Sequence, residues 1–396
     1  MTRLTLELFS ITMVPEVDLD PEYDPEMEES ELGSDDSQDM SMEDGEPEDH
    51  NTDSVELPDS LVVITVLNKD HLVVGCMDNN IYIAAVDSTS RLSLVKVLEG
   101  HTDTVTDFAV NGNLSQFASA SYDGTIIIWS SISFEKVDTI DGPSTGIDRL
   151  VWDYKTNRLM AACEDGTVWF WDYSDGYVNT ANVGAGHTLE VTSLAIKNNC
   201  LVSSSLDGQV IIWDILSGEM KHKIRASHND EIRSMAVHPQ LGTCAVGTDT
   251  GKVTIVSTEA ARTVGQTHDQ ESSVECVAFD ASGSFLCSGS TGGCLIIRDV
   301  SRLLKAPRHE IKIEDEAIST ITWHNGNDVI VFVGTSTGKI TAYSPFTGEC
   351  LSTLSSGGSS ILSMVCLIGN DGHSTIVTGS DDGVLRSFDI ELTTVA

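Results

Sequence analysis

The stretch SSSLDGQVIIWD, residues 203–214, combines a run of hydroxyl side chains, an Asp-Gly pair and an apolar run that ends in Trp-Asp. Asp-Gly between two runs of strand-forming residues is a strong hairpin signal, because glycine adopts the left-handed backbone conformation of a tight turn without strain. Related stretches occur at residues 119–130, 161–172 and 377–389. A hairpin that recurs along one chain indicates a repeat architecture.

Two markers measure the period of this repeat. The second residue of each expected hairpin turn recurs every 42 to 45 residues, at Asn80, Gly124, Gly166, Gly208, Gly251, Gly293, Gly338 and Gly383. The first residue of an apolar strand recurs in phase every 41 to 44 residues, at Leu61, Val105, Ile147, Val191, Ile232, Val274, Ile318 and Ile361. The two markers agree on eight units.

A period of this length with several short β runs is typical of the four-stranded blade of a β-propeller. Helical repeats of similar length would place apolar residues at positions i, i+3 and i+4, which these runs do not do. The sequence therefore predicts an all-β, eight-bladed propeller. Seven blades plus an accessory hairpin is the alternative, because the first unit is the least regular. We expect residues near Ser54 to Leu57 to complete the last blade and so remove an exposed sheet edge.

The charge of the chain is −39 and is unevenly distributed. Positions 16–59 hold 20 Asp or Glu residues and no Lys or Arg. A segment of this composition buries too little apolar surface to offset the entropy of ordering it. We therefore expect a disordered acidic tail over residues 1–53 and the propeller over residues 54–396. The charge disfavours binding to nucleic acid or to an anionic membrane and favours a basic partner.

The cysteines and the apolar runs bear on the compartment of the protein. Nine cysteines are scattered singly and no Cys-x-x-Cys occurs, which suits a reducing compartment better than a disulfide framework or a zinc site. No apolar run approaches the roughly 20 residues of a membrane span. We expect a cytoplasmic protein without a metal site, and entry into the nucleus stays open.

The unit that ends at Asp214 begins with Gly186-His187 and resembles a WD repeat. The resemblance implies that His187, a hydroxyl of Ser203 or Ser205, Asp207 and Trp213 form a buried hydrogen-bonded set, and that His101, Asp123 and Trp129 do the same in the second unit. Because this set recurs at the period of the blades, we assign it to stability. The sequence predicts no enzyme and no cofactor.

Four later units lack the tryptophan of this set. The residues that take its position are Val256, Arg298, Tyr343 and Phe388. We expect those blades to rely more on packing.

One face of the expected ring collects acidic loops. The connection from an outermost strand to the next innermost strand lies on the same face as the middle hairpin turn of each blade. Fourteen such loops contain no Lys or Arg, whereas bases occur elsewhere. We predict that acidic residues in these loops bind a basic partner, and the residues are Asp103, Glu164, Glu190, Asp230, Glu231, Asp249, Asp269, Glu271, Glu314, Asp315, Glu316 and Asp381.

Three stretches carry a closer resemblance: EVDLDPEYDPEMEESE (16–31), MAACEDGTVWFWDYSDG (160–176) and SSVECVAFDASGSFLCSGSTGGCLIIRD (272–299). They resemble the family of angio-associated migratory cell protein and its fungal counterparts. The resemblance implies a dedicated chaperone that captures the basic N-terminal segment of a newly made large-subunit ribosomal protein and supports ribosome assembly. We expect a monomer that binds neither nucleic acid nor membrane. A scaffold or adaptor in signalling or in ubiquitin-ligase substrate recruitment is the alternative.

Overall fold

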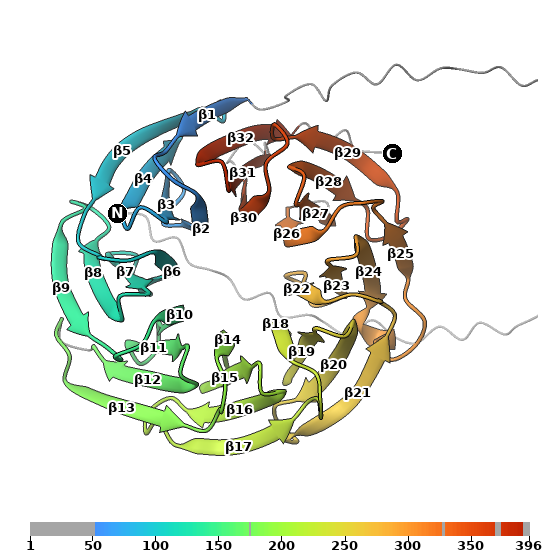
Figure 1. Ribbon diagram of the computed structural model, residues 1–396, viewed down its shortest axis with the longest axis horizontal. Coiled ribbons are helices and arrows are strands. Elements are labelled where there is room, and N and C mark those ends of the chain that lie inside the picture. Colours follow the sequence, from blue (N-terminus) through green and yellow to red (C-terminus); the bar gives the residue numbers. More distant parts are fainter. Residues whose placement is uncertain (1–51, 174–175, 327–328, 369–373, 391–396) are drawn as a thin grey trace, which may run out of the picture. The chain divides into compact units, whose positions relative to one another are not determined.

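A computed structural model describes residues 52–173, 176–326, 329–368 and 374–390. Its strands form eight four-stranded antiparallel sheets, which are arranged as the blades of a ring around a central opening (Figure 1). The prediction of an eight-bladed propeller is confirmed, and the alternative of seven blades is wrong. The predicted tail over residues 1–53 lies outside the described residues, except for its last two positions.

Each blade has an innermost, a second, a third and an outermost strand. The innermost strands of blades one to eight are β2 (Leu61–Val66), β6 (Val105–Val110), β10 (Ile147–Asp153), β14 (Val191–Lys197), β18 (Ile232–Val237), β22 (Val274–Phe279), β26 (Ile318–Asn325) and β30 (Ile361–Ile368). The second strands are β3 (His71–Cys76), β7 (Gln116–Ser121), β11 (Arg158–Cys163), β15 (Cys200–Ser205), β19 (Thr243–Thr248), β23 (Phe285–Ser290), β27 (Val329–Thr335) and β31 (Ser374–Ser380).

The third and outermost strands follow the same blade order. The third strands are β4 (Ile81–Val86), β8 (Thr125–Ser130), β12 (Thr167–Asp172), β16 (Gln209–Asp214), β20 (Lys252–Ser257), β24 (Cys294–Asp299), β28 (Lys339–Tyr343) and β32 (Val384–Ile390). The outermost strands are β5 (Leu92–Leu98), β9 (Lys136–Asp141), β13 (Thr180–Ala185), β17 (Met220–Arg225), β21 (Arg262–His268), β25 (His309–Lys312), β29 (Cys350–Ser355) and β1 (Asp53–Glu56). A short 3-10 turn, η1 (Val300–Arg302), lies between β24 and β25.

The ring is closed by the two ends of the described chain. Strand β1 pairs antiparallel with β32, so that Asp53 lies opposite Ser387 and Glu56 lies opposite Val384. The amide of Leu57 extends this pairing by donating to the carbonyl of Gly383 at 2.8 Å. The predicted completion of the last blade is therefore confirmed. It matters because an unpaired outer edge is a template for aggregation.

The innermost strands begin at the eight residues that the apolar marker predicts. The turn marker needs one correction, in blade one. The left-handed residue there is Asn79 (φ 72°), which takes the place of glycines such as Gly124 (φ 77°) in the other blades. Asn80 was therefore the wrong choice by one position. Asparagine tolerates the left-handed region better than other residues with a side chain, which explains why this turn forms without glycine.

The apolar core lies between neighbouring blades. Between blades three and four, Phe170 packs against Trp213 with ring centroids 6.1 Å apart, and Val191 and Leu201 join the same cluster. Trp213 lies opposite Leu201 in the sheet. The residues in the same sheet position of blades five to eight are Val256, Arg298, Tyr343 and Phe388, as the sequence alignment of the units predicts.

All nine cysteines are free thiols. Burial raises the pKa of several of them, for example that of Cys163 to about 12. Within the described ranges no helix is long and apolar enough to cross a membrane.

Candidate functional site

Two kinds of loop meet at one face of the ring. In every blade, the amide of the residue after the second strand donates to the carbonyl of the residue before the innermost strand, at 2.9–3.2 Å. The pairs are Met77 and Ser60, Tyr122 and Thr104, Glu164 and Gly146, Leu206 and Glu190, Asp249 and Glu231, Thr291 and Ser273, Ser336 and Ala317, and Asp381 and Ser360. The middle turns and the connections that precede innermost strands therefore share one face, which we call the acidic face.

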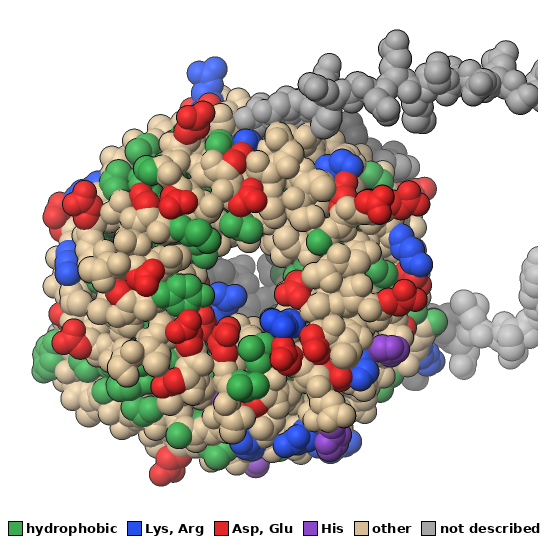
Figure 2. Space-filling model, viewed as in Figure 1, with side chains coloured by type: hydrophobic (Ala, Val, Ile, Leu, Met, Phe, Trp, Pro, Cys, Tyr) green, Lys and Arg blue, Asp and Glu red, His purple; other side chains and the backbone are tan. Residues whose placement is uncertain are grey.

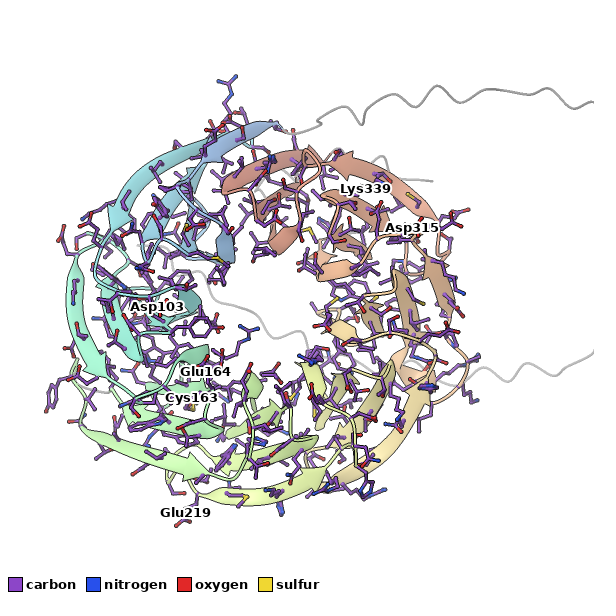
Figure 3. The ribbon with its side chains drawn as sticks, in the orientation of Figure 1. Asp103, Cys163, Glu164, Glu219, Asp315 and Lys339 are labelled. Carbon is purple, nitrogen blue, oxygen red and sulfur yellow. The ribbon has the colours of Figure 1, made fainter. Side chains whose placement is uncertain are left out.

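Figure 2 shows acidic side chains around the central opening of the ring, with a few basic side chains among them. Figure 3 labels three acidic-face residues, Asp103, Glu164 and Asp315, in three different blades. Glu219, which belongs to a connection between a third and an outermost strand, lies at the outer rim in the same view. The candidate site is thus a surface assembled from many loops of the ring.

Blade four holds its loop on this face through four side chains. The hydroxyl of Ser203 lies 2.8 Å from His187 Nε2 and accepts a hydrogen bond of 2.8 Å from the indole of Trp213. His187 Nδ1 lies 3.2 Å from the carboxylate of Asp207. Ser203, and not Ser205, takes part, because the Ser205 hydroxyl donates to the carbonyl of Leu189 at 3.0 Å.

Blade two repeats the arrangement. His101 Nε2 lies 2.7 Å from the hydroxyl of Ser119, the Trp129 indole donates to that hydroxyl at 2.9 Å, and His101 Nδ1 lies 3.2 Å from Asp123. Buried polar groups that satisfy one another in this way fix a single conformation.

The turn aspartates of these two blades are strongly bonded carboxylates. Burial raises the pKa of Asp123, but hydrogen bonds from His101, Thr102 and Thr125 outweigh it, so that the net pKa is well below its usual range. The same balance of burial against bonds from His187, Thr188 and Gln209 lowers the pKa of Asp207.

Each of these aspartates also positions a predicted partner-binding acid. Asp123 accepts the amide of Thr102 at 2.8 Å, one residue before Asp103. Asp207 accepts the amide of Thr188 at 2.9 Å, two residues before Glu190. The hydrogen-bonded sets of blades two and four therefore fix the loops that carry Asp103 and Glu190.

The later blades use ion pairs in the corresponding places. Lys252 lies 2.7 Å from Asp230, and Lys339 pairs with Glu316. These blades therefore add ion pairs to the packing that the sequence predicts for them. A lysine as the first residue of a third strand reaches the acid of the connection beside it, and this closes the loop much as the histidine does in blade four.

Blades six and eight also carry ion pairs near this face. Arg298, which occupies the tryptophan position of blade six, pairs with Asp269. In blade eight Arg386 pairs with Asp382 at 2.7 Å. These arginines lie inside strands, so an inventory of loop residues does not detect them.

The structure divides the twelve predicted partner-binding acids into two groups. Four are paired with a base, namely Asp230, Glu231 (with Arg233, 2.6 Å), Asp269 and Glu316. Eight form no ion pair among the described residues, namely Asp103, Glu164, Glu190, Asp249, Glu271, Glu314, Asp315 and Asp381. The second group leaves negative charge available to a partner.

Acidic residues inside the innermost strands lie outside the twelve predicted acids. Asp148, the second residue of β10, is only 7% exposed and has a carboxylate oxygen, Oδ2, without a hydrogen-bond partner among the described residues. Burial, followed by the charges of Glu190 and Glu164, raises its pKa to about 7. Asp148 lies inside an apolar strand, so it is not among the loop residues from which the acidic set was predicted. The available signal was a carboxylate at a position where blades two, four and seven have Thr or Ser.

In the described part of the chain, no group of three or more His, Cys, Asp or Glu side chains is placed to hold a metal ion. The repeated His, Ser and Asp side chains are engaged with one another and with tryptophan, as described above. The face therefore offers charge and hydrogen-bond acceptors, which are suited to binding.

Four segments of the chain match a family model. The model of the WD domain, G-beta repeat, matches residues 92–130, 134–172, 180–214 and 262–299. Each match covers the outermost strand of one blade and the three inner strands of the next. The fold is a β-propeller, and the four matched segments carry the WD40 repeat.

Curated relatives match parts of the chain. They include Cell division control protein 4 of Saccharomyces cerevisiae (28% identical over 30% of this chain), the Ribosome biogenesis protein WDR12 homolog of Nematostella vectensis (26% over 53%) and Nuclear distribution protein nudF of Aspergillus oryzae (33% over 33%). The matches span 18%, 57% and 29% of the lengths of these relatives.

Solved structures match nearly the whole propeller. Sqt1 of Saccharomyces cerevisiae superposes with a TM-score of 0.78 at 17% identity, over 87% of this chain and 99% of Sqt1. Sqt1 of Chaetomium thermophilum bound to the N-terminus of the ribosomal protein L10 superposes with a TM-score of 0.76 at 19% identity, over 87% of this chain and all of Sqt1. At these identities the likeness shows the fold.

Proposed function

We propose that this protein is a chaperone that binds the basic N-terminal segment of a newly made large-subunit ribosomal protein on its acidic face. It acts by binding and not by catalysis, as a cytoplasmic monomer. Under this proposal it is a counterpart of Sqt1 and of angio-associated migratory cell protein. The client's identity is set by its basic sequence, which the acidic face complements.

One observation carries the proposal. Eight acidic side chains of one face have no basic partner among the described residues, although other acids of the same face do. Unpaired like charges on one surface repel one another, so they favour a ligand that brings positive charge. Six of them, Asp103, Glu164, Glu271, Glu314, Asp315 and Asp381, are exposed and so accessible to an extended peptide.

Similarity to two kinds of protein supports the ribosomal assignment. The Chaetomium thermophilum Sqt1 structure holds the N-terminus of ribosomal protein L10, and its ring has the same fold. The Nematostella vectensis relative is named as a ribosome biogenesis protein. The acidic face supplies the chemistry that a basic ribosomal segment requires.

Affinity purification from cells, followed by mass spectrometry, tests the proposal with a charge-reversed variant. Asp103, Glu271 and Glu314 are exposed, carry no ion pair among the described residues and lie outside the hydrogen-bonded sets. Their joint replacement by lysine is expected to weaken binding of the purified basic client about tenfold to about a hundredfold, since each exposed contact contributes up to about 1 kcal/mol.

The matched control replaces Glu219, Glu259 and Glu349 by lysine. These exposed glutamates lie in connections between third and outermost strands, on the other side of the ring, and the change in net charge is the same. The control is expected to keep the client. Equal loss of binding in both variants would show that only net charge matters. Recovery of ubiquitin-ligase subunits in place of a ribosomal protein would support the adaptor alternative.

A further inference from the structure

We propose that Tyr122, Asp148, Glu164 and Glu190 form a pocket on the acidic face that binds a single guanidinium group. The inference rests on the proposed function and adds that one arginine of the basic segment is held at a defined place. The four residues come from blade two, blade three and the connection that leads into blade four.

The position of Asp148 in its strand is a special one. All eight innermost strands contain a bulge at their second residue. In three blades this residue is a Thr or Ser whose hydroxyl donates to a carbonyl at the start of the next blade. The bonds run from Thr106 to Ile147 (2.6 Å), from Thr192 to Ile232 (3.1 Å) and from Ser319 to Ile361 (2.6 Å). In these three blades the bulge therefore places a donor that links neighbouring blades.

Asp148 occupies this position in blade three and does not fit that role. A carboxyl group donates to a carbonyl only when it is protonated, and among the described residues Asp148 makes no such bond. Its Oδ2 atom is buried and has no partner among the described residues. A buried polar atom without a partner is costly, so its presence requires a reason other than blade linkage.

The surroundings of Asp148 bring further acceptors to the same place. Charges of Glu190 and Glu164 act on Asp148, while Arg149 and a hydrogen bond from Tyr122 act in the opposite sense. The hydroxyl of nearby Thr145 is also buried without a partner among the described residues. Two unsatisfied oxygens thus lie within four residues of the chain.

Gly146 allows these side chains to converge. A Cβ atom at this position would lie 2.6 Å from Tyr122 Cδ1 and 2.8 Å from Glu164 Oε2, both closer than real Cβ contacts. The amide of Gly146 donates to Glu164 Oε2 at 3.2 Å and so orients that carboxylate. Tyr122, Glu164 and the segment that carries Asp148 therefore meet over a residue without a side chain.

The chemistry of the pocket favours guanidinium over other cations. Its carboxylates match the forked donors of arginine, and Tyr122, an exposed residue, offers an aromatic ring on which a planar cation stacks. The described residues contain no group of three or more His, Cys, Asp or Glu side chains close enough together to hold a metal ion, so the spacing of these carboxylates suits a larger cation. A lysine side chain would match the negative charge of the pocket, but it has neither the forked donors nor the planar group that stacks on an aromatic ring.

Calorimetry with two peptides tests the pocket. The probes are an acetylated, amidated peptide in which arginines are separated by Gly and Ser, and its lysine counterpart. The unmodified protein is expected to bind the arginine peptide more tightly.

Because Asp148 has a pKa of about 7, binding of a cation should release protons near neutral pH, and affinity should rise as the pH increases through about 7. Arginine does not titrate in this range, so these protons come from the protein. Two buffers with different ionisation enthalpies measure their release.

The variant Asp148→Thr restores the hydroxyl found in neighbouring blades. It should unfold at no lower temperature than the unmodified protein, bind the arginine peptide at least about tenfold more weakly, and lose both the arginine preference and the proton release. Asp148→Asn preserves the shape of the side chain and should lose the same properties. Glu219→Gln removes an exposed acid from the other side of the ring and should retain them.

The outcomes separate the two proposals. Unchanged arginine affinity and unchanged proton release in both Asp148 variants would overturn the pocket and leave the proposed function in place. Failure of the unmodified protein to bind either peptide would overturn the proposed function together with the pocket.

Discussion

Blades two and four fix their acidic-face loops with a histidine, a serine, an aspartate and a tryptophan, whereas blades five and seven fix theirs with a lysine and an acid. In blade four the pinning carboxylate is Asp207 of the turn, so the loop acid Glu190 stays unpaired. In blade seven the loop acid Glu316 itself fixes the loop by pairing with Lys339, and this ion pair neutralises its charge. Similar loops therefore differ in the charge that they leave for a partner.

This difference redistributes the negative charge of the ring. Blades two to four keep Asp103, Glu164 and Glu190 available, and add Asp148 beneath them. In blades five and seven, Asp230 and Glu316 form ion pairs within the blade and are not available to a partner. The number of acidic residues in a loop is thus a poor measure of its capacity to bind a basic ligand.

The largest effect is expected from the tryptophan that blades two and four possess and blades five and seven lack. Trp213 is 1% exposed, so Trp213→Ala should open a cavity and lower the free energy of unfolding by about 3–5 kcal/mol. Denaturant unfolding measures the change. Trp169→Ala is the control, because Trp169 is only half-buried on the surface of blade three. Equal losses in the two variants would show that the buried set contributes nothing beyond apolar area.

An intermediate effect is expected from the turn aspartate. Asp207→Asn should cost about 1–3 kcal/mol near neutral pH, because it weakens the bonds to His187 and Thr188. The folded pKa of Asp207 is lowered, so its stabilisation is present above the unfolded pKa of about 3.9 and is lost as the pH falls through the folded pKa. The variant should therefore lose less stability on acidification than the unmodified protein.

Unfolding in denaturant at a series of pH values below about 5 tests this expectation. Asp165→Asn provides the matched control, since Asp165 has the same turn position in blade three but bonds to Thr167 and not to a histidine. If the free energy of unfolding of Asp207→Asn fell with pH as steeply as that of the unmodified protein, the stabilising role of the Asp207 carboxylate would be contradicted.

The smallest effect is expected from the second kind of blade. Lys339 is about half exposed, so Lys339→Ala should cost only about 1 kcal/mol, mostly because Glu316 is left buried without its base. Adding Glu316→Gln should restore part of the loss. Thermal unfolding at low and high salt measures both. Lys312→Ala, which removes a base at 4.0 Å from Glu310 in an exposed pair, should change nothing. A loss as large as that of Trp213→Ala would overturn the ranking of the two kinds of blade.

The period of the repeat made the fold predictable, because the features that mark a blade are local. An innermost strand such as β14 is a short apolar run, and its turn depends on a left-handed residue such as Gly208. Blade one shows the limit of this logic. There asparagine replaces glycine, and two consecutive asparagines leave the position of the turn undecided until the strands pair.

The candidate site was less predictable, because its charges meet through tertiary contacts. Asp230 and Lys252 are 22 residues apart, and only the closing of blade five brings them together. Asp148 looks like part of a core strand in the sequence. Its environment comes from Tyr122, Glu164 and Glu190, which belong to three separate loops. A local sequence pattern cannot predict that side chains from separate loops come together.

The pairing of β1 with β32 has a consequence for the order of events during synthesis. Seven sheets are each built from one contiguous stretch, so their strands are available to pair as soon as that stretch leaves the ribosome. The eighth sheet joins residues 334 positions apart, such as Asp53 and Ser387. Closing so long a loop costs entropy and slows folding. Until β32 has been made, β1 has no partner and the ring cannot close, so closure must follow the synthesis of all eight blades.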